Sequence, residues 1–200
     1  MDVTGSHGGG RYYESMFTVE CLIRNRGGLE VANSTVDQPL EHLVACHGRI
    51  EERLAILERA GAVLDTHTAE ALDAIQGCFR YFDTSGIMHT ADEEESTFPR
   101  LRPRLTPEQI GEIERLERDH RIADEMYEKL KAVTTRLRAG VTPESIEEYR
   151  GIVRQFTAHY RSHIEFENTR LIAVCRENLA PEELQAISTE MKRRRGLIRD

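Results

Sequence analysis

Two histidine–glutamate pairs are the residues in this 200-residue sequence whose spacing points most directly to chemistry. His89 precedes Glu93 by four residues, and His163 precedes Glu167 by the same interval. Residues four apart on a helix share one face, so each pair would place an imidazole beside a carboxylate, and both side chains are metal ligands. The run Asp92–Glu95 is also what a solvated helix face carries. Each pair is therefore either half of a metal site or part of a polar surface.

Long amphipathic segments with helix start and stop signals follow Asp37. A threonine followed by proline, at Thr106 and Thr142, is typical of a helix start, and Thr106 also has a glutamine three residues later, which makes a capping box. Gly61 and Pro99 are expected to end the two earlier helices. The predicted helices extend from Asp37 to about Arg59, from Thr66 or Thr68 to Phe98, from Thr106 to about Gly140, from Thr142 to about Asn178, and from Pro181 onward.

The order of these helices predicts the fold class. Short connections between the first and second helices, and between the third and fourth, predict antiparallel neighbours. The expected fold is all-α, an up-down-up-down four-helix bundle with a short fifth C-terminal helix, and no run of alternating apolar and polar residues predicts a strand. Residues 1–36 contain the glycine-rich run GSHGGG and little apolar content, so they are expected to form a weakly structured N-terminal extension to a domain of residues 37–200.

Each of the four long helices carries a histidine on its apolar seam, the face expected to line the core. In the second helix the steps at Phe79, Phe82 and Gly86 continue into His89 and Glu93. This pair is therefore predicted to point inward. The candidate metal ligands on the four seams are His47, His89, Glu93, His120, His163 and Glu167.

The six candidate ligands are expected at one level of the bundle. At a rise of ~1.5 Å per residue, their distances from the predicted helix ends place them in a layer roughly 10 Å thick. A lone histidine on a seam is usually a hydrogen-bonded core residue, but two buried carboxylates without a cation would each cost several kcal/mol. Four neutral histidines do not supply that charge, whereas a pair of divalent cations does.

The six positions and their flanking residues resemble the hemerythrin-like HHE cation-binding family over roughly residues 37–180. The similar stretches are Cys46-His47-x-Arg49-Ile50, Phe82-Asp83 ahead of His89, Asp92-Glu93-Glu94 with Phe98-Pro99 after it, Asp119-His120, and Tyr160-x-x-His163-Ile164-x-x-Glu167. The resemblance implies a non-haem centre of two iron ions, with substitution by manganese or zinc left open. It also implies four terminal imidazole ligands, two per iron, and two bridging carboxylates: His47, His89, His120 and His163, with Glu93 and Glu167.

The resemblance further implies a protein that reacts with oxygen, nitric oxide or peroxide in a redox or stress role. Two alternatives are iron storage, sensing or donation without turnover, and reversible oxygen carriage; whether the chain is an enzyme is left open. Respiratory hemerythrins carry a second histidine on the third helix and an aspartate on the last, where this sequence has Asp124 and Glu167. This departure argues against an oxygen carrier.

Four residues near the predicted centre have two alternative roles each, and a fifth lies on another face. His159 is either a fifth ligand or proton donor, or a half-exposed imidazole at the edge of the seam. Asp124 and Tyr127 either support the ligands or have ordinary surface and core roles. Gly86 either leaves space for a small ligand or is a tolerated helix glycine. His42 lies on another face of the first helix and is not expected to bind metal.

The composition bears on partners and location. The chain has 27 Lys+Arg against 35 Asp+Glu and no Trp, which argues against nucleic acid as a partner. The basic run Lys192–Arg195 is expected to complement the dipole of the last helix rather than form a binding patch. The four cysteines include no Cys-x-x-Cys pair, which favours reduced thiols and a cytoplasmic location, and no apolar run approaches the ~20 residues of a membrane span. The expected partner is a small diatomic or peroxide ligand, and a protein partner is left open.

Overall fold

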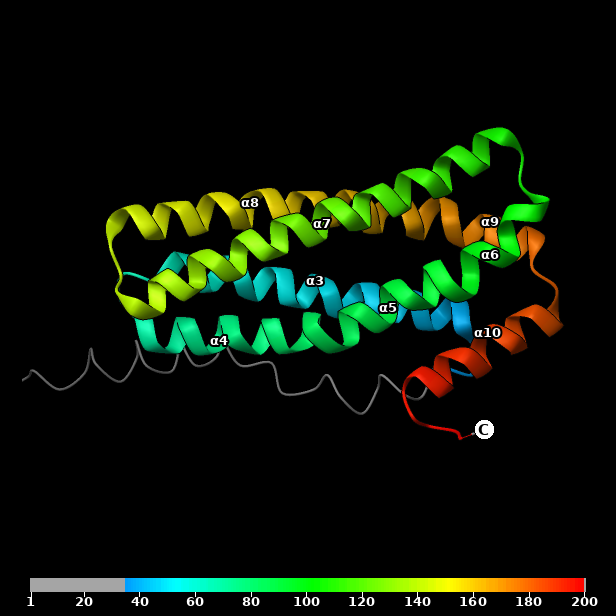
Figure 1. Ribbon diagram of the computed structural model, residues 1–200, viewed down its shortest axis with the longest axis horizontal. Coiled ribbons are helices and arrows are strands. Elements are labelled where there is room, and N and C mark those ends of the chain that lie inside the picture. Colours follow the sequence, from blue (N-terminus) through cyan, green and yellow to red (C-terminus); the bar gives the residue numbers. More distant parts are fainter. Residues whose placement is uncertain (1–34, 200) are drawn as a thin grey trace, which may run out of the picture.

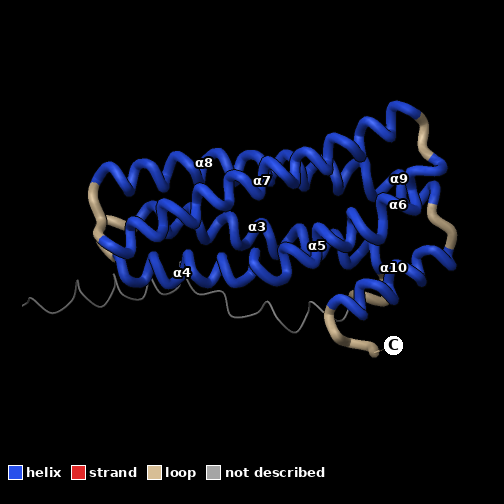
Figure 2. Tube along the Cα trace, in the orientation of Figure 1, coloured by secondary structure: helices blue, strands red, loops and turns tan. Residues whose placement is uncertain are grey.

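The computed structural model describes residues 35–199, and the regular elements in that range are all helical (Figure 2). Four long helical rods form the body, and several shorter segments join end to end within two of them. The rods are α3 (Pro39–Val63); α4 (Thr68–Tyr81) with η1 (Phe82–Gly86), α5 (Ile87–Ala91), η2 (Asp92–Thr97), α6 (Phe98–Leu101) and η3 (Arg102–Arg104); α7 (Pro107–Ala139); and α8 (Pro143–Phe166) with η4 (Glu167–Leu171) and α9 (Ile172–Asn178).

Consecutive rods run in opposite directions, as Figure 1 shows. α3 packs against both α4 and α8, and α7 packs against α8. The predicted all-α fold is confirmed. The short fifth helix is present as α10 (Pro181–Arg194), which lies at one end of the bundle against η2 and α3.

The predicted helix starts at the two threonines are confirmed. The backbone N–H of Gln109 donates to Thr106 Oγ1 at 3.3 Å, and the backbone N–H of Thr106 donates to Gln109 Oε1 at 3.0 Å, which completes the capping box of α7. The backbone N–H of Ser145 donates to Thr142 Oγ1 at 3.2 Å at the start of α8. The first helix begins at Pro39 with Gln38 at its N-cap position, one residue later than the predicted cap Asp37, and Asp37 forms an ion pair with Lys192 of α10 instead.

The predicted stop at Gly61 is wrong, because α3 continues through this residue to Val63. A Cβ atom at position 61 would lie 3.0 Å from Cε1 of Tyr149, a fully buried side chain of α8. The Tyr149 hydroxyl donates to the Leu57 carbonyl at 3.2 Å, one turn earlier on α3. Glycine here permits the close approach of two rods and does not terminate a helix.

The predicted stop at Pro99 is also wrong, since the rod continues through α6 to Leu101 and through η3 to Arg104. A proline within a helix lacks the N–H that would bond to a carbonyl one turn earlier. In this chain the π-helical turn η2 comes directly before α6, and Thr97 Oγ1 donates to the Asp92 carbonyl within that turn at 2.8 Å. The wider turn changes which carbonyls need partners, so the rod accommodates the proline.

Two clusters of buried apolar side chains are separated along the rods by the layer that holds the candidate ligands. On α3, Leu40 and Leu43 belong to the cluster beside α10, and Ile50 and Leu54 belong to the cluster that extends toward the α3–α4 connection. His47 lies between them, and it is also buried. The polar layer therefore divides the bundle interior into two apolar cores.

Residues 1–34 of the predicted N-terminal extension lie outside the described residues. The last two residues of that extension, Thr35 and Val36, are described: Val36 is fully buried, and Thr35 Oγ1 lies in hydrogen-bonding contact with His42 Nδ1 at 2.9 Å. No helix within residues 35–199 is long and apolar enough to cross a membrane.

Candidate metal centre

The structure brings all six candidate ligands together. Their ligand atoms form two groups, each within 4.8 Å, and both groups include the same two carboxylates. The six side chains are buried, with exposed fractions from 0% to 7%. One group is His47, His89, Glu93 and Glu167; the other is His120, His163, Glu93 and Glu167.

Glu93 directs one carboxylate oxygen to each pair of imidazoles. Its Oε1 atom lies 3.8 Å from His47 Nε2 and 3.7 Å from His89 Nε2. Its Oε2 atom lies 3.3 Å from His120 Nε2. The carboxylate therefore faces both halves of the layer.

Glu167 has the same arrangement from the opposite rod. Its Oε2 atom lies 3.1 Å from His47 Nε2, whereas Oε1 lies 3.0 Å from His163 Nε2 and 3.9 Å from His120 Nε2. Two carboxylates that each divide their oxygens between two imidazole pairs have the donor arrangement of a two-metal carboxylate site.

The hydrogen bonds of the layer show that these groups fit a pair of metal ions. Several buried ligand atoms have no hydrogen-bond partner among the described residues, although native proteins satisfy most buried polar atoms. Imidazole nitrogens and carboxylate oxygens that face one another in this way offer their lone pairs to a common point. These atoms are Nε2 of His47 and His120 and both carboxylate oxygens of Glu93 and Glu167.

Outer partners hold two of the imidazoles in the orientation that ligation requires. His47 Nδ1 contacts Asn168 Oδ1 at 2.7 Å, and His120 Nδ1 contacts Glu94 Oε1 at 2.8 Å. When Nδ1–H donates to these oxygens, the lone pair of the neutral ring is on Nε2 and points into the layer. Neither Asn168 nor Glu94 was predicted from the sequence, because both lie off the seams.

The electrostatics of the layer correct one step of the sequence argument. Burial opposes the charge of the His47 ring, but its contacts with Glu167 and Glu93 outweigh burial and raise its pKa to about 10. Burial likewise opposes the charge of His120, and Glu93 and Glu94 raise its pKa to about 10. Burial lowers the pKa of His89 to about 4. Protonated imidazoles can therefore compensate the carboxylates, so buried charge alone does not require a metal, and the arrangement of lone pairs is the stronger argument.

Both carboxylates lie in π-helical turns. Glu93 is in η2 and Glu167 is the first residue of η4, so the two histidine–glutamate pairs sit at junctions between α and π geometry. A π turn inside an α-helix is rare and occurs frequently at functional sites. The four-residue spacing in the sequence identifies both histidine–glutamate pairs, but it does not predict the π-helical turns in which the glutamates lie.

His42 and His159, like His67, lie outside both groups. His159 Nε2 contacts the Asp119 backbone carbonyl at 2.8 Å, which supports the interpretation of His159 as a half-buried imidazole at the edge of the seam. His42 is fully buried, which was not expected from the sequence, and it contacts Thr35 at 2.9 Å and Cys46 at 3.6 Å rather than the ligand groups.

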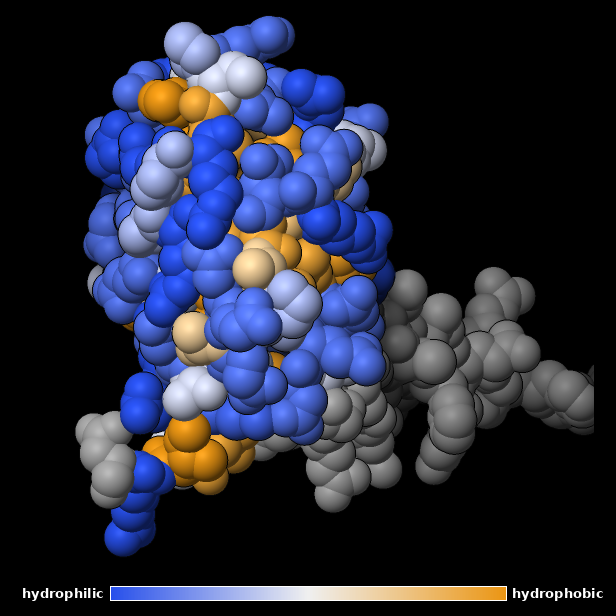
Figure 3. Space-filling view, turned by 90° about the vertical axis from the view of Figure 1, so that its right-hand side faces the viewer, coloured by the Kyte–Doolittle hydropathy of each residue, from blue (hydrophilic) through white to orange (hydrophobic). Residues whose placement is uncertain are grey.

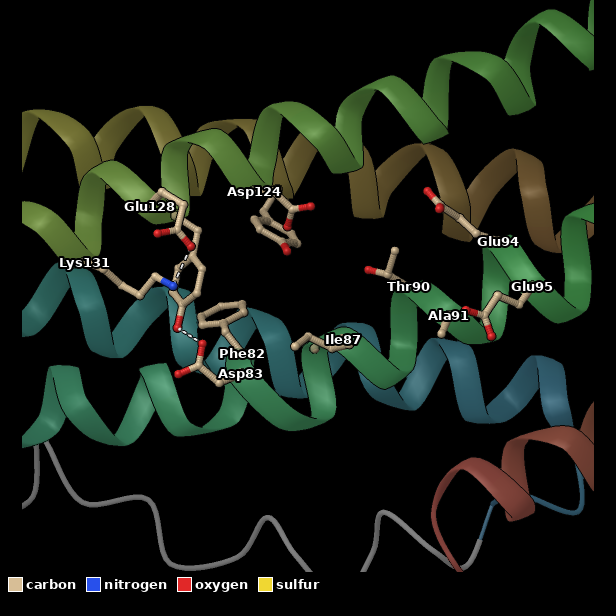
Figure 4. Close-up of a pocket in the computed structure, with 13 residues that line it drawn as sticks. Phe82, Asp83, Ile87, Thr90, Ala91, Glu94, Glu95, Asp124, Glu128 and Lys131 are labelled. Atoms are coloured by element: carbon tan, nitrogen blue, oxygen red, sulfur yellow. Dashed lines mark hydrogen bonds and ion pairs between the residues drawn. The ribbon is translucent and has the colours of Figure 1, made fainter.

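A cleft of about 490 Å³ opens beside the layer, between the second rod and α7 (Figure 4). Gly86, Asp124 and Tyr127, for each of which the sequence left two alternative roles, line it together with Tyr160. The Tyr127 hydroxyl donates to Asp83 Oδ1 at 2.9 Å and to the Phe79 carbonyl at 3.2 Å, so it fixes part of the wall. Glu94, the partner of His120, also lines the cleft and connects it to the ligand layer.

Asp92 is not on a solvated face, as the acidic run suggested, but is fully buried. It forms ion pairs with Arg194 and Arg195, which belong to the basic run at the end of α10. Burial raises the pKa of the Asp92 carboxyl, and the two guanidinium groups oppose that shift. The basic run therefore has an internal acidic partner in addition to any effect on the helix dipole.

Comparison with known proteins identifies the family. The model of the hemerythrin HHE cation-binding domain matches residues 38–175, which is most of the chain, and this protein belongs to that family. A comparison with curated protein sequences gives no match. The matched range contains all six candidate ligands and ends before α10.

Proposed function

We propose that this member of the hemerythrin HHE family holds two iron ions in the polar layer. His47 and His89 would bind one ion, His120 and His163 would bind the other, and the two carboxylates of Glu93 and Glu167 would bridge them. The observation that carries the proposal is the division of each carboxylate between the two imidazole pairs, with one oxygen toward each.

A pair of iron ions in such a site supplies electrons to a small bound ligand, and we propose oxygen, nitric oxide or peroxide as that ligand. The chain keeps bulk water away from the layer with apolar side chains. Phe79, Phe82, Phe156 and Ile50 belong to the core on one side of it and are at most 5% exposed. A dry layer strengthens the electrostatic interactions inside it.

The charge of the cleft indicates which small molecules approach the layer most readily. Its lining has five carboxylates and one ammonium group, an excess of negative charge that disfavours anions. Neutral oxygen, nitric oxide and hydrogen peroxide meet no such barrier. The charged residues are Asp83, Glu94, Glu95, Asp124, Glu128 and Lys131.

Tyr160 is placed to hold a proton between the cleft and the layer. Its ring lines the cleft and lies 6.3 Å from the His163 ring, centroid to centroid. Burial raises the pKa of Tyr160 above its usual range, so the hydroxyl stays protonated and available as a hydrogen-bond donor at neutral pH.

Metal analysis of the purified protein tests the proposal. We expect about two iron ions per chain after growth with ample iron. Glu93→Ala should lose more than half of the metal, because this carboxylate serves both groups. His42→Ala is the matched control, a buried histidine outside both groups, and should keep the wild-type content. A single zinc ion per chain, or no metal, would contradict the proposal.

One observation favours iron sensing or donation as a second candidate function. The negative cleft that disfavours anions also attracts cations, so iron could pass through it in either direction. The two functions can be told apart by comparing the rate of iron transfer to a chelator with the rate of reaction with a small ligand. If ferrous iron passes to a chelator faster than the reduced protein reacts with oxygen, nitric oxide or peroxide, donation is favoured. We expect the reduced protein to oxidise in air without releasing oxygen under vacuum, whereas repeated reversible oxygenation would indicate an oxygen carrier.

A further inference from the structure

The C-terminal helix α10 lies outside the range matched by the family domain and packs against the turn that carries Glu93. Its inward face is anchored by Ile187 and Met191, which are fully buried in the core beside it. Figure 3 views this end of the molecule and shows a mostly hydrophilic surface. The contact between α10 and η2 also includes ion pairs from Arg194 and Arg195 to Asp92.

The polar pairs converge on Asp92. Arg195 Nη2 lies 2.6 Å from Asp92 Oδ2, and Arg195 Nη1 lies 3.1 Å from Asp92 Oδ1, so this guanidinium makes a two-point contact. Arg194 also pairs with Asp92, and its Nη2 atom reaches Glu95 at 3.1 Å and Ser96 at 3.3 Å. Two-point contacts between guanidinium and carboxylate fix geometry as well as charge.

Asp92 and Glu93 are adjacent residues at the start of η2 and serve different partners. The Asp92 carboxylate meets α10, and the Glu93 carboxylate faces the imidazoles of the ligand layer. Both are fully buried. A buried carboxylate that loses its cation is strongly unfavourable, so the turn would shift to bring Asp92 to water and would take Glu93 with it.

We propose that Arg194 and Arg195 of α10 act as a clasp on Asp92 that positions Glu93, so that retention of both metal ions depends on a helix that contacts neither ion. The inference rests on the proposed metal centre. Because Glu93 belongs to both ligand groups, release of the clasp affects both ions and not one.

Other contacts keep α10 on the bundle when the clasp is removed. Arg104 pairs with Glu183 at 2.8 Å near the start of α10, and Arg100 makes a two-point contact with Glu190, with distances of 2.6 Å and 3.0 Å. The clasp can therefore be tested without undocking the helix.

The test compares rates of metal release to a chelator from protein loaded with Co²⁺. We expect Arg194→Met with Arg195→Met to release the metal about tenfold faster or more, the size of effect seen when partners of metal ligands are removed. Adding Asp92→Asn to this double variant should restore a rate near wild type, because no unpaired charge remains. Arg104→Met is the matched control and should leave the rate unchanged. An unchanged rate in the double variant, or no restoration by Asp92→Asn, would overturn the proposal.

Amide hydrogen exchange of the metal-free chain gives a second measurement that needs no bound ion. We expect faster exchange in residues 88–101 of the double variant, reversed by Asp92→Asn, with residues 143–160 unchanged. If the wild-type chain binds no metal, the proposed function fails while this measurement still decides whether the clasp holds η2. If the double variant does not fold, Arg195→Met alone takes its place, and exchange equal to wild type would refute the clasp.

Discussion

Loading the centre with divalent metal at pH 7 is expected to release about two protons per chain. His47 and His120 have pKa values of about 10, because the neighbouring carboxylates outweigh the effect of burial. Both rings are therefore protonated at pH 7 in the metal-free chain. Both rings must lose a proton before Nε2 can bind a metal. His89 has a pKa of about 4 and is already neutral.

Release of two protons makes the loading equilibrium depend steeply on pH. The combined equilibrium constant for both ions should rise about 100-fold for each pH unit near pH 7, which is ~2.7 kcal/mol. Calorimetric titration with Mn²⁺ in buffers of different ionisation enthalpy counts the protons. His42→Ala should leave the count unchanged, since burial lowers the pKa of His42 to about 3 and that ring is already neutral. An affinity that does not change with pH would refute the assignment of protons to His47 and His120.

Three further predictions concern outer partners, packing and the metal-free chain. Asn168→Ala should lower metal affinity about tenfold in chelator competition, because the His47 ring loses its acceptor, whereas Asn168→Asp should not. Gly61→Val should lower the free energy of unfolding by about 1–3 kcal/mol in urea titration, since its side chain would meet Tyr149; an unchanged midpoint would contradict this packing. The metal-free protein should lose thermal stability as pH rises. The raised pKa values of His47 and His120 contribute stability that is complete below their ordinary value of 6.5 and lost on passing through about pH 10.

The ligand layer could be predicted from the sequence because its members lie on the apolar seams of helices, and the spacing of residues reveals those seams. Glu93 follows His89 at a helical interval, at the end of an apolar seam. The burial of His47 and His120 on other rods follows from the same pattern. Fold class and candidate site therefore came from a periodicity of three and four residues, which depends only on local helix geometry.

The partners of these ligands could not be predicted, because they depend on contacts between distant segments. Asn168 contacts His47, which lies 121 positions away in the sequence, and Arg195 contacts Asp92, which lies 103 positions away. Neither asparagine nor arginine at these positions interrupts a seam.

The helix ends at Gly61 and Pro99 were predicted wrongly for a related reason. Close packing against another rod explains the first and a wide turn explains the second, and neither is visible in local residue preferences.

The polar layer between the two apolar cores affects how the molecule unfolds. Each core has its own buried side chains, and the rods pass from one to the other through the ligand groups. Bound metal ions would link all four rods at that level. The two halves should then unfold together, in a single calorimetric transition. When a chelator removes the ions, the link consists of ion pairs that weaken as the imidazoles lose their protons. The two halves should then melt separately at alkaline pH, so the metals would set the cooperativity of the fold as well as its chemistry.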